Sequence, residues 1–104
     1  MPQIILTYRL KPGVDRENYE KWSREVDFPA IRGLRRVAAF RKFRTTGLFL
    51  GEGSPSIDYV EFFDIPDLDG FRAEDLPGEV VQKIMGDFVA FVDDAEFLIA
   101  EEVV

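Results

Sequence analysis

The chain has 104 residues, of which 13 are basic and 20 acidic, so its formal charge is −7, and it contains no histidine. This length predicts one domain spanning residues 1–104, and the 46% apolar content is enough for a hydrophobic core rather than a disordered chain. Because Cys and His are both absent, the composition excludes a thiol nucleophile, an imidazole base and a zinc finger. We expect neither a metal site nor a cofactor.

The first third of the chain predicts a strand followed by a helix. Residues 3–10 form a β-branched and aromatic run that stops at the turn signal Lys11-Pro12-Gly13. Asp15 suits the N-cap of the helix, and the pair Phe28-Pro29 is expected to end its regular part. Ile31 and Leu34 are expected to continue its apolar edge through an irregular or short helical segment. The apolar residues of this helix recur at the spacing of one face: Tyr19, Trp22 and Val26.

The middle of the chain predicts two strands joined by a glycine-rich connection. Residues 37–46 are expected to form a strand with Phe40 on one face and Phe43 on the other. Residues 47–56 contain three Gly and one Pro, which indicates a hairpin-type connection or a mobile loop. Residues 57–65 carry the strongest strand signal of the chain.

The last third predicts a helix and a final strand. A helical turn is expected within residues 67–76, and a longer helix from about Pro77 to Val92. Asp93-Asp94 are expected to break this helix, with a strand over residues 96–103. The order β-α-β-β-α-β predicts an α+β ferredoxin-like fold, a four-stranded antiparallel sheet with both helices on one face.

The expected strands place apolar side chains on both faces of the sheet. Tyr59, Glu61 and Phe63 alternate with Val60 and Phe62, although helices cover only one side. A second copy of the chain is the usual cover for such a face, so we predict a homodimer with facing sheets.

Charge is divided unevenly along the chain. Residues 1–44 hold 11 basic and 5 acidic side chains, whereas residues 45–104 hold 2 and 15. The basic stretch 32–44 has two interpretations: a cradle for an anionic ligand, or charges that protect an edge strand and attract the acidic half. The overall negative charge and the lack of RNA-recognition glycines in residues 57–63 argue against nucleic-acid binding. The N-terminal residues resemble neither a signal peptide nor a membrane span, so we expect a cytoplasmic protein.

Several aromatic and charged runs resemble the dimeric α/β-barrel proteins, and among these the RedY-like or HapK-type family encoded with prodiginine pigment pathways. The runs are Tyr19-Glu20-Lys21-Trp22, Asp27-Phe28-Pro29, Phe40-Arg41-Lys42-Phe43-Arg44 and Tyr59-Val60-Glu61-Phe62-Phe63. The resemblance implies a homodimer and a small-molecule cleft between each sheet and its helices. The haem-degrading relatives rely on a His that this chain lacks.

The candidate ligand-binding residues are Tyr8, Tyr19, Trp22, Asp27, Arg41, Phe43, Tyr59, Glu61 and Phe88. Six of them have a structural alternative: Trp22 as a core anchor, Tyr8 and Tyr59 as core rings with hydroxyls at water, Arg41 with Glu61 as an ion pair, and Asp27 as a turn residue. The sequence does not identify catalytic residues.

Three functions follow as hypotheses. The first is a homodimer that binds an aromatic or pyrrole-type intermediate of secondary metabolism and assists its modification or delivery. The second is a cofactor-free monooxygenase, in which Asp27 or Glu61 accepts a proton if burial raises its pKa. The third is a structural or partner-binding dimer.

Overall fold

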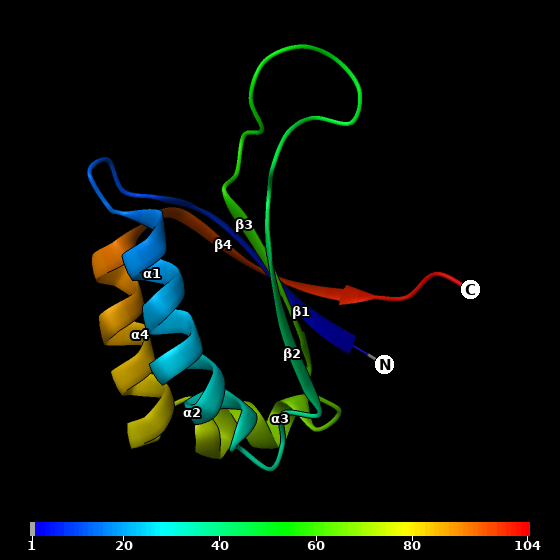
Figure 1. Ribbon diagram of the computed structural model, residues 1–104. Coiled ribbons are helices and arrows are strands. Elements are labelled where there is room, and N and C mark those ends of the chain that lie inside the picture. Colours follow the sequence, from blue (N-terminus) through cyan, green and yellow to red (C-terminus); the bar gives the residue numbers. More distant parts are fainter. Residues whose placement is uncertain (1) are drawn as a thin grey trace.

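The computed structural model describes residues 2–104 and has the predicted ferredoxin-like arrangement. The sheet is antiparallel with strand order β2-β3-β1-β4, and the helices lie on one side of it (Figure 1). In chain order the elements are β1 (Pro2–Leu10), α1 (Arg16–Trp22), the π-helical turn η1 (Ser23–Asp27), α2 (Phe28–Arg32), β2 (Ala39–Arg44), β3 (Tyr59–Asp64), α3 (Leu68–Gly70), the π-helical turn η2 (Phe71–Asp75), α4 (Glu79–Phe91) and β4 (Val92–Glu101).

The regular part of the first helix ends at Trp22 rather than at the predicted Phe28-Pro29. The short helical segment expected around Ile31 is present, because η1 and α2 carry the helix on through Pro29 to Arg32. The backbone N–H of Phe28 donates to the carbonyl of Ser23, so the chain makes a wider turn just before the proline. Pro29 then occupies the first turn of α2, where its missing N–H is tolerated. The wider turn also leaves Tyr19, Ser23 and Asp27 buried along one helix.

The last helix and strand also differ from the prediction. α4 begins at Glu79 with Gly78 as its N-cap rather than at Pro77. Asp93 and Asp94 do not separate helix from strand, because β4 starts directly at Val92. Asp94 has a positive φ of 56°, a conformation that Asp adopts more readily than most residues, and the β1–β4 register shifts beside it between Thr7 and Arg9.

The connection between β2 and β3 is longer than predicted, because β2 already ends at Arg44 and β3 begins only at Tyr59. It projects away from the sheet and helices at the top of Figure 1. Leu48, Phe49 and Leu50 are exposed in it, and Gly51 and Gly53 have positive φ angles.

Two clusters of buried side chains fill the space between sheet and helices. The first is rich in tyrosine and consists of Leu6, Tyr8, Tyr19, Tyr59, Phe88 and Val92. The second is aliphatic apart from one Phe and consists of Ile31, Val37, Phe40, Ile65, Val81 and Ile84. Trp22 and Phe63 pack against both. Within residues 2–104 no helix is both long and apolar enough to cross a membrane.

Candidate functional site

The helix-facing side of the sheet carries a charged pair on the neighbouring strands β2 and β3. The β2–β3 register sets Lys42 directly opposite Glu61, with Phe40 opposite Phe63 and Arg44 opposite Tyr59. Tyr59 and Glu61 are buried on this side, which confirms the predicted alternation of β3. The two opposite charges therefore enter the core side by side.

The Lys42 ammonium is held by groups from the first helix as well as by β3. Its Nζ donates to Asp27 Oδ2 at 2.9 Å, to Ser23 Oγ at 2.7 Å and to the Tyr19 hydroxyl at 2.9 Å. Glu61 Oε2 lies 3.5 Å away. The side chains of Lys42 and Asp27 are 4% exposed and that of Glu61 is 3% exposed, so all three charged side chains are almost fully buried. We call Lys42, Asp27 and Glu61 the Lys42 cluster.

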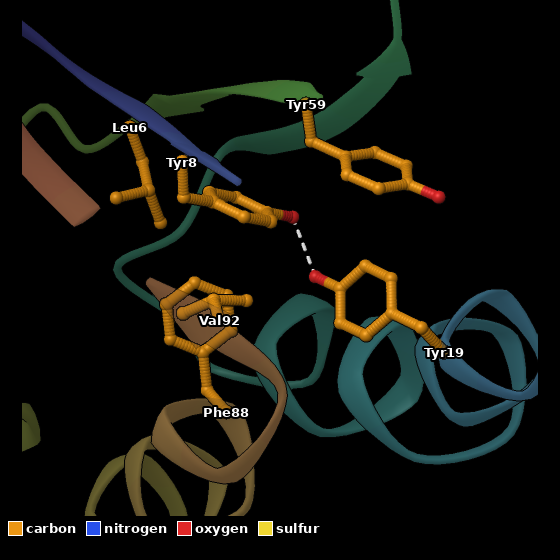
Figure 2. Packing of buried hydrophobic residues seen from close by; sticks show 6 residues of the cluster. All are labelled: Leu6, Tyr8, Tyr19, Tyr59, Phe88 and Val92. Atoms are coloured by element: carbon orange, nitrogen blue, oxygen red, sulfur yellow. Dashed lines mark hydrogen bonds between the residues drawn. The ribbon is translucent and has the colours of Figure 1, made fainter. Parts of the chain in front are cut away.

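Two tyrosine hydroxyls connect the Lys42 cluster with β1. Tyr8 on β1 donates to Glu61 Oε2 at 2.5 Å, and its oxygen lies 2.5 Å from the Tyr19 oxygen. Figure 2 shows the Tyr8 and Tyr19 hydroxyls pointing toward one another, while the Tyr59 hydroxyl points away from both. Tyr59 instead donates to Glu20 Oε2. Arg44 also binds this carboxylate, with Nε donating to Oε2 and Nη2 to Oε1.

Burial sets the protonation behaviour of these groups. Removal from water raises the pKa of Glu61 to about 7, despite the opposing effects of Lys42 and the Tyr8 hydrogen bond. Desolvation also raises the pKa of Asp27, and it raises the pKa of both Tyr8 and Tyr19, so the tyrosines remain protonated. Glu61 is therefore a group that gains or loses a proton near neutral pH.

An apolar cavity of about 120 Å³ lies against this cluster between the sheet and α4. Its lining residues are Ile4, Leu6, Asp27, Ile31, Glu61, Phe63, Ile65, Phe71, Leu76, Val81, Ile84, Met85, Phe88 and Phe97. Asp27 and Glu61 are the charged members of this lining. An apolar cavity of about 150 Å³ in another protein holds benzene, so the volume here suits a single aromatic ring.

A second hollow lies on the other side of the Lys42 cluster. It has a volume of about 350 Å³ and is lined by Glu20, Ser23, Arg24, Phe28, Lys42, Phe43, Arg44 and Tyr59. This hollow is polar where the cavity is apolar. Lys42 and Ser23 face the hollow, Asp27 and Glu61 face the cavity, and the hydrogen bonds of the cluster separate the two spaces.

The structure brings together most of the residues proposed from the sequence. One network contains Tyr8, Tyr19, Asp27 and Glu61. Phe88 packs edge-on against Tyr8, with 4.9 Å between the two ring centroids. Three of the other four sit beside or away from the network: Trp22 stacks on Tyr19 and donates to Asp87, Tyr59 binds Glu20, and Phe43 is half exposed.

Arg41 does not pair with Glu61, contrary to the prediction. It lies opposite Phe62 on the other face of the sheet, where its guanidinium lies over the Phe43 ring. The pleat turns neighbouring side chains to opposite faces, so the partner of Glu61 is Lys42. Lys42 and Ser23 are the two functional candidates that the sequence reasoning missed. The sequence contained a signal for Lys42: it lies two residues after Phe40, so strand alternation places both side chains on the core-facing side.

The basic stretch 32–44 is largely engaged with the rest of the fold. Arg36 binds Asp67, Glu74 and Asp75 of the acidic half, and Arg44 binds Glu20. These ion pairs support the structural interpretation of the stretch. Within residues 2–104 no group of three or more acidic side chains is arranged to hold a metal ion.

Comparison with known proteins adds a family to this geometry. The model of the family described as REDY-like protein HapK matches residues 2–103. The chain belongs to the REDY-like HapK family. This confirms the resemblance drawn from the aromatic and charged runs. Among curated proteins, none matches the sequence.

Solved structures with the same fold include HapK and proteins with other descriptions. HapK from Hahella chejuensis has a TM-score of 0.80 at 24% identity, with 99% of this chain and 93% of that chain covered. A dimeric ferredoxin-like protein from Thermobifida fusca has a TM-score of 0.73 at 17% identity, covering 97% and 90%. An antibiotic biosynthesis monooxygenase has a TM-score of 0.71 at 16% identity, covering both chains in full. At these identities the likeness concerns the fold.

Proposed function

We propose that this protein is a homodimer that binds a small aromatic or pyrrole-type intermediate of secondary metabolism in its apolar cavity and assists the modification or delivery of that intermediate. The observation that carries the proposal is the pairing of an apolar cavity of about 120 Å³ with two buried carboxyl groups in its wall. Membership of the REDY-like HapK family supports it.

The cavity wall matches a ring that carries one polar hydrogen. Phe63 and Phe88 offer ring edges and faces, and the aliphatic side chains exclude water. A pyrrole N–H or a phenol O–H that points at Glu61 would donate to its carboxylate. An apolar ring without such a donor would leave that buried carboxylate without the added hydrogen bond, so the site should prefer the donor.

Binding can be tested with pyrrole and phenol as probes, using calorimetry and native mass spectrometry. Ile84→Phe fills the cavity from α4, whereas Val89→Phe adds the same ring at an exposed position of that helix. We expect Ile84→Phe to abolish binding and Val89→Phe to retain it. A folded Ile84→Phe variant that binds both probes like the wild type would contradict the proposed site.

The outer face of the sheet supports the homodimer. Ile5, Phe62 and Leu98 lie in one cross-strand row on that side, and Phe43 packs edge-on against Phe62. The relative from Thermobifida fusca is described as dimeric. Native mass spectrometry should find two subunits in the wild type, one in Leu98→Asp, and two in the control Val89→Asp on the helical side. A monomeric wild type would remove this part of the proposal.

A cofactor-free monooxygenase is the second candidate, and the position of Glu61 favours it. Its raised pKa, of about 7, suits a general base that removes a phenol proton, after which the electron-rich phenolate reduces dioxygen. Incubation of a polyketide phenol with isotopically heavy dioxygen distinguishes the candidates. Incorporation of one heavy oxygen atom that Glu61→Gln abolishes supports the monooxygenase, and an unchanged bound phenol supports binding or delivery.

A structural or partner-binding dimer is the third hypothesis. Such a role requires no cavity beside ionisable groups, whereas a space of about 120 Å³ lies beside Glu61 and Asp27. We therefore favour the ligand-binding function.

A further inference from the structure

We propose that Lys42, Tyr19 and Tyr8 form a proton relay that leads from the polar hollow to Glu61 at the apolar cavity. The proposal deepens the proposed function, because it assigns a route by which the cavity carboxyl is reprotonated while a ligand excludes water from it. The relay is the chain of short hydrogen bonds that ends at Glu61. A second link between the two spaces, the Lys42–Asp27 hydrogen bond, ends at Asp27, and the direct distance of 3.5 Å from Lys42 Nζ to Glu61 Oε2 is longer than each contact of the relay.

The contacts define the direction of every hydrogen in this relay. Tyr8 has a single hydroxyl hydrogen, which it donates to Glu61 Oε2. The 2.5 Å contact between the two phenol oxygens therefore requires Tyr19 to donate to Tyr8. Tyr19 in turn accepts from Lys42 Nζ at 2.9 Å, since an ammonium group can only donate. All hydrogens point from Lys42 toward Glu61.

The two ends of the relay open on different surroundings. Lys42 and Ser23 line the polar hollow, so a solvent acid in the hollow has access to the Lys42 end. Glu61 lines the cavity, where most of the wall is apolar and an aromatic ligand would displace any water. The ionisable groups facing Glu61 are Lys42 from β2, Asp27 from η1, Tyr8 from β1 and Tyr19 from α1, whereas α4 contributes Phe88.

One turnover of the relay moves one proton from solvent to the ligand. Glu61 gives its carboxyl proton to the ligand, and Tyr8 passes its hydroxyl proton to Glu61. Tyr19 replaces the proton of Tyr8, Lys42 replaces that of Tyr19, and a solvent acid in the hollow restores the ammonium. Burial raises the pKa of both tyrosines, so a free tyrosinate is costly and the protons shift together. In this direction Glu61 serves as a general acid.

The test uses the ligand-free protein with carbon-13 in its glutamate carboxyl groups. Glu61 is assigned by the loss of its signal in Glu61→Gln, and its line shape at the titration midpoint gives the rate of proton exchange with water. Tyr19→Phe removes the middle hydroxyl of the relay, and Tyr59→Phe removes a hydroxyl of the same core cluster that binds Glu20 instead. A merely structural role of Tyr19 would move the midpoint rather than the exchange rate.

We expect Tyr19→Phe to slow the exchange of Glu61 at least about 10-fold, the scale of a lost proton-transfer group, and Tyr59→Phe to leave it unchanged. If Tyr19→Phe does not fold, Tyr8→Phe interrupts the same chain. Exchange at the wild-type rate in a folded variant of either tyrosine overturns the relay. So does slower exchange of the wild type in toluene-saturated buffer, because the proton would then enter through the cavity. Neither result depends on whether pyrrole or phenol binds.

Discussion

Two ion clusters of this molecule have similar composition and opposite surroundings. The Lys42 cluster joins one ammonium to Asp27 and Glu61 in the core. At the surface, Arg36 joins Asp67, Glu74 and Asp75, of which Asp67 is 62% and Glu74 69% exposed. We call these four residues the Arg36 cluster. Both contain one cation and more than one carboxyl group.

The pKa values of Glu61 and Asp27 shift in the opposite direction to that of Asp67. In the core, desolvation raises the pKa of Glu61 and Asp27 although a cation is in contact with them. At the surface, the Gly70 N–H and the Arg36 guanidinium lower the pKa of Asp67, because water still solvates its charge. Burial rather than the number of ion pairs decides whether a carboxyl group is ready to exchange a proton near neutral pH.

The largest expected effect is that of removing the buried cation. Lys42→Met leaves two buried carboxyl groups without a counter-charge, which should lower the free energy of unfolding at pH 7 by about 3–5 kcal/mol. Urea denaturation measures it, and Lys83→Met, at an exposed i,i+4 ion pair, serves as the control with little change. A loss for Lys42→Met as small as that of the control would mean that burial adds nothing to the cost of removing the cation.

The second prediction uses the sign of the Glu61 shift. Because the folded protein holds this proton up to about pH 7, whereas the unfolded chain releases it near pH 4.5, the contribution of Glu61 to stability falls as pH rises between these values. Relative to the wild type, Glu61→Gln should gain about 3 kcal/mol in unfolding free energy across that window.

Glu20 provides the opposite control for this pH dependence. Hydrogen bonds from Arg44 and Tyr59 lower its pKa to about 2, so its stabilising contribution is present above pH 4.5 and is lost as pH falls toward 2. Urea denaturation of Glu20→Gln and Glu61→Gln as a function of pH should therefore give difference curves of opposite slope. Parallel curves would show that burial does not dominate at Glu61.

A smaller effect is expected from removal of one buried hydroxyl. Tyr8→Phe deprives Glu61 of a hydrogen bond that favours its charged form, so the pKa of Glu61 should rise further. The loss of unfolding free energy should be about 1–3 kcal/mol, typical of a buried polar group that loses its partner. Carbon-13 NMR of the carboxyl group follows the titration, and an unchanged midpoint would argue against a Tyr8–Glu61 bond in solution.

The smallest effect belongs to the Arg36 cluster. Arg36→Ala should lower the urea midpoint only slightly, and high salt should remove the difference, because exposed ion pairs are screened. Hydrogen exchange should increase in the α3–η2 segment, which the guanidinium ties to the rest of the fold. A large, salt-independent loss of stability would show that this cluster behaves as a buried one.

The sequence was sufficient for the order of elements and for the face of each strand. Alternation in residues 57–65 placed Tyr59, Glu61 and Phe63 together, and the structure confirms that Tyr59 and Glu61 are buried. The predicted ends of some elements were wrong, because the surrounding structure overrode the local sequence signals. Pro29 continues a helix because a π-helical turn precedes it, and Asp94 is accommodated within β4 at a positive φ.

The candidate site was partly predictable from the pattern of residue types along the strands and helices. Its tyrosines and carboxyl groups were identified because they are aromatic or acidic on apolar faces. Lys42 was overlooked in favour of its neighbour Arg41, and Ser23 had no distinguishing signal. Choosing between Arg41 and Lys42 requires the strand register, which is a contact between residues far apart in the chain.

The amino-acid sequence alone determined the ferredoxin-like order of elements, the absence of thiol and imidazole chemistry, and the family to which the chain belongs, because composition and periodicity are local properties. The tertiary structure decided that Lys42 rather than Arg41 meets Glu61, that two tyrosines link them, and that an apolar cavity adjoins them. The pKa of Glu61 follows from these contacts and the loss of water around them, and both arise only when β1, β2, β3 and the first helix pack together.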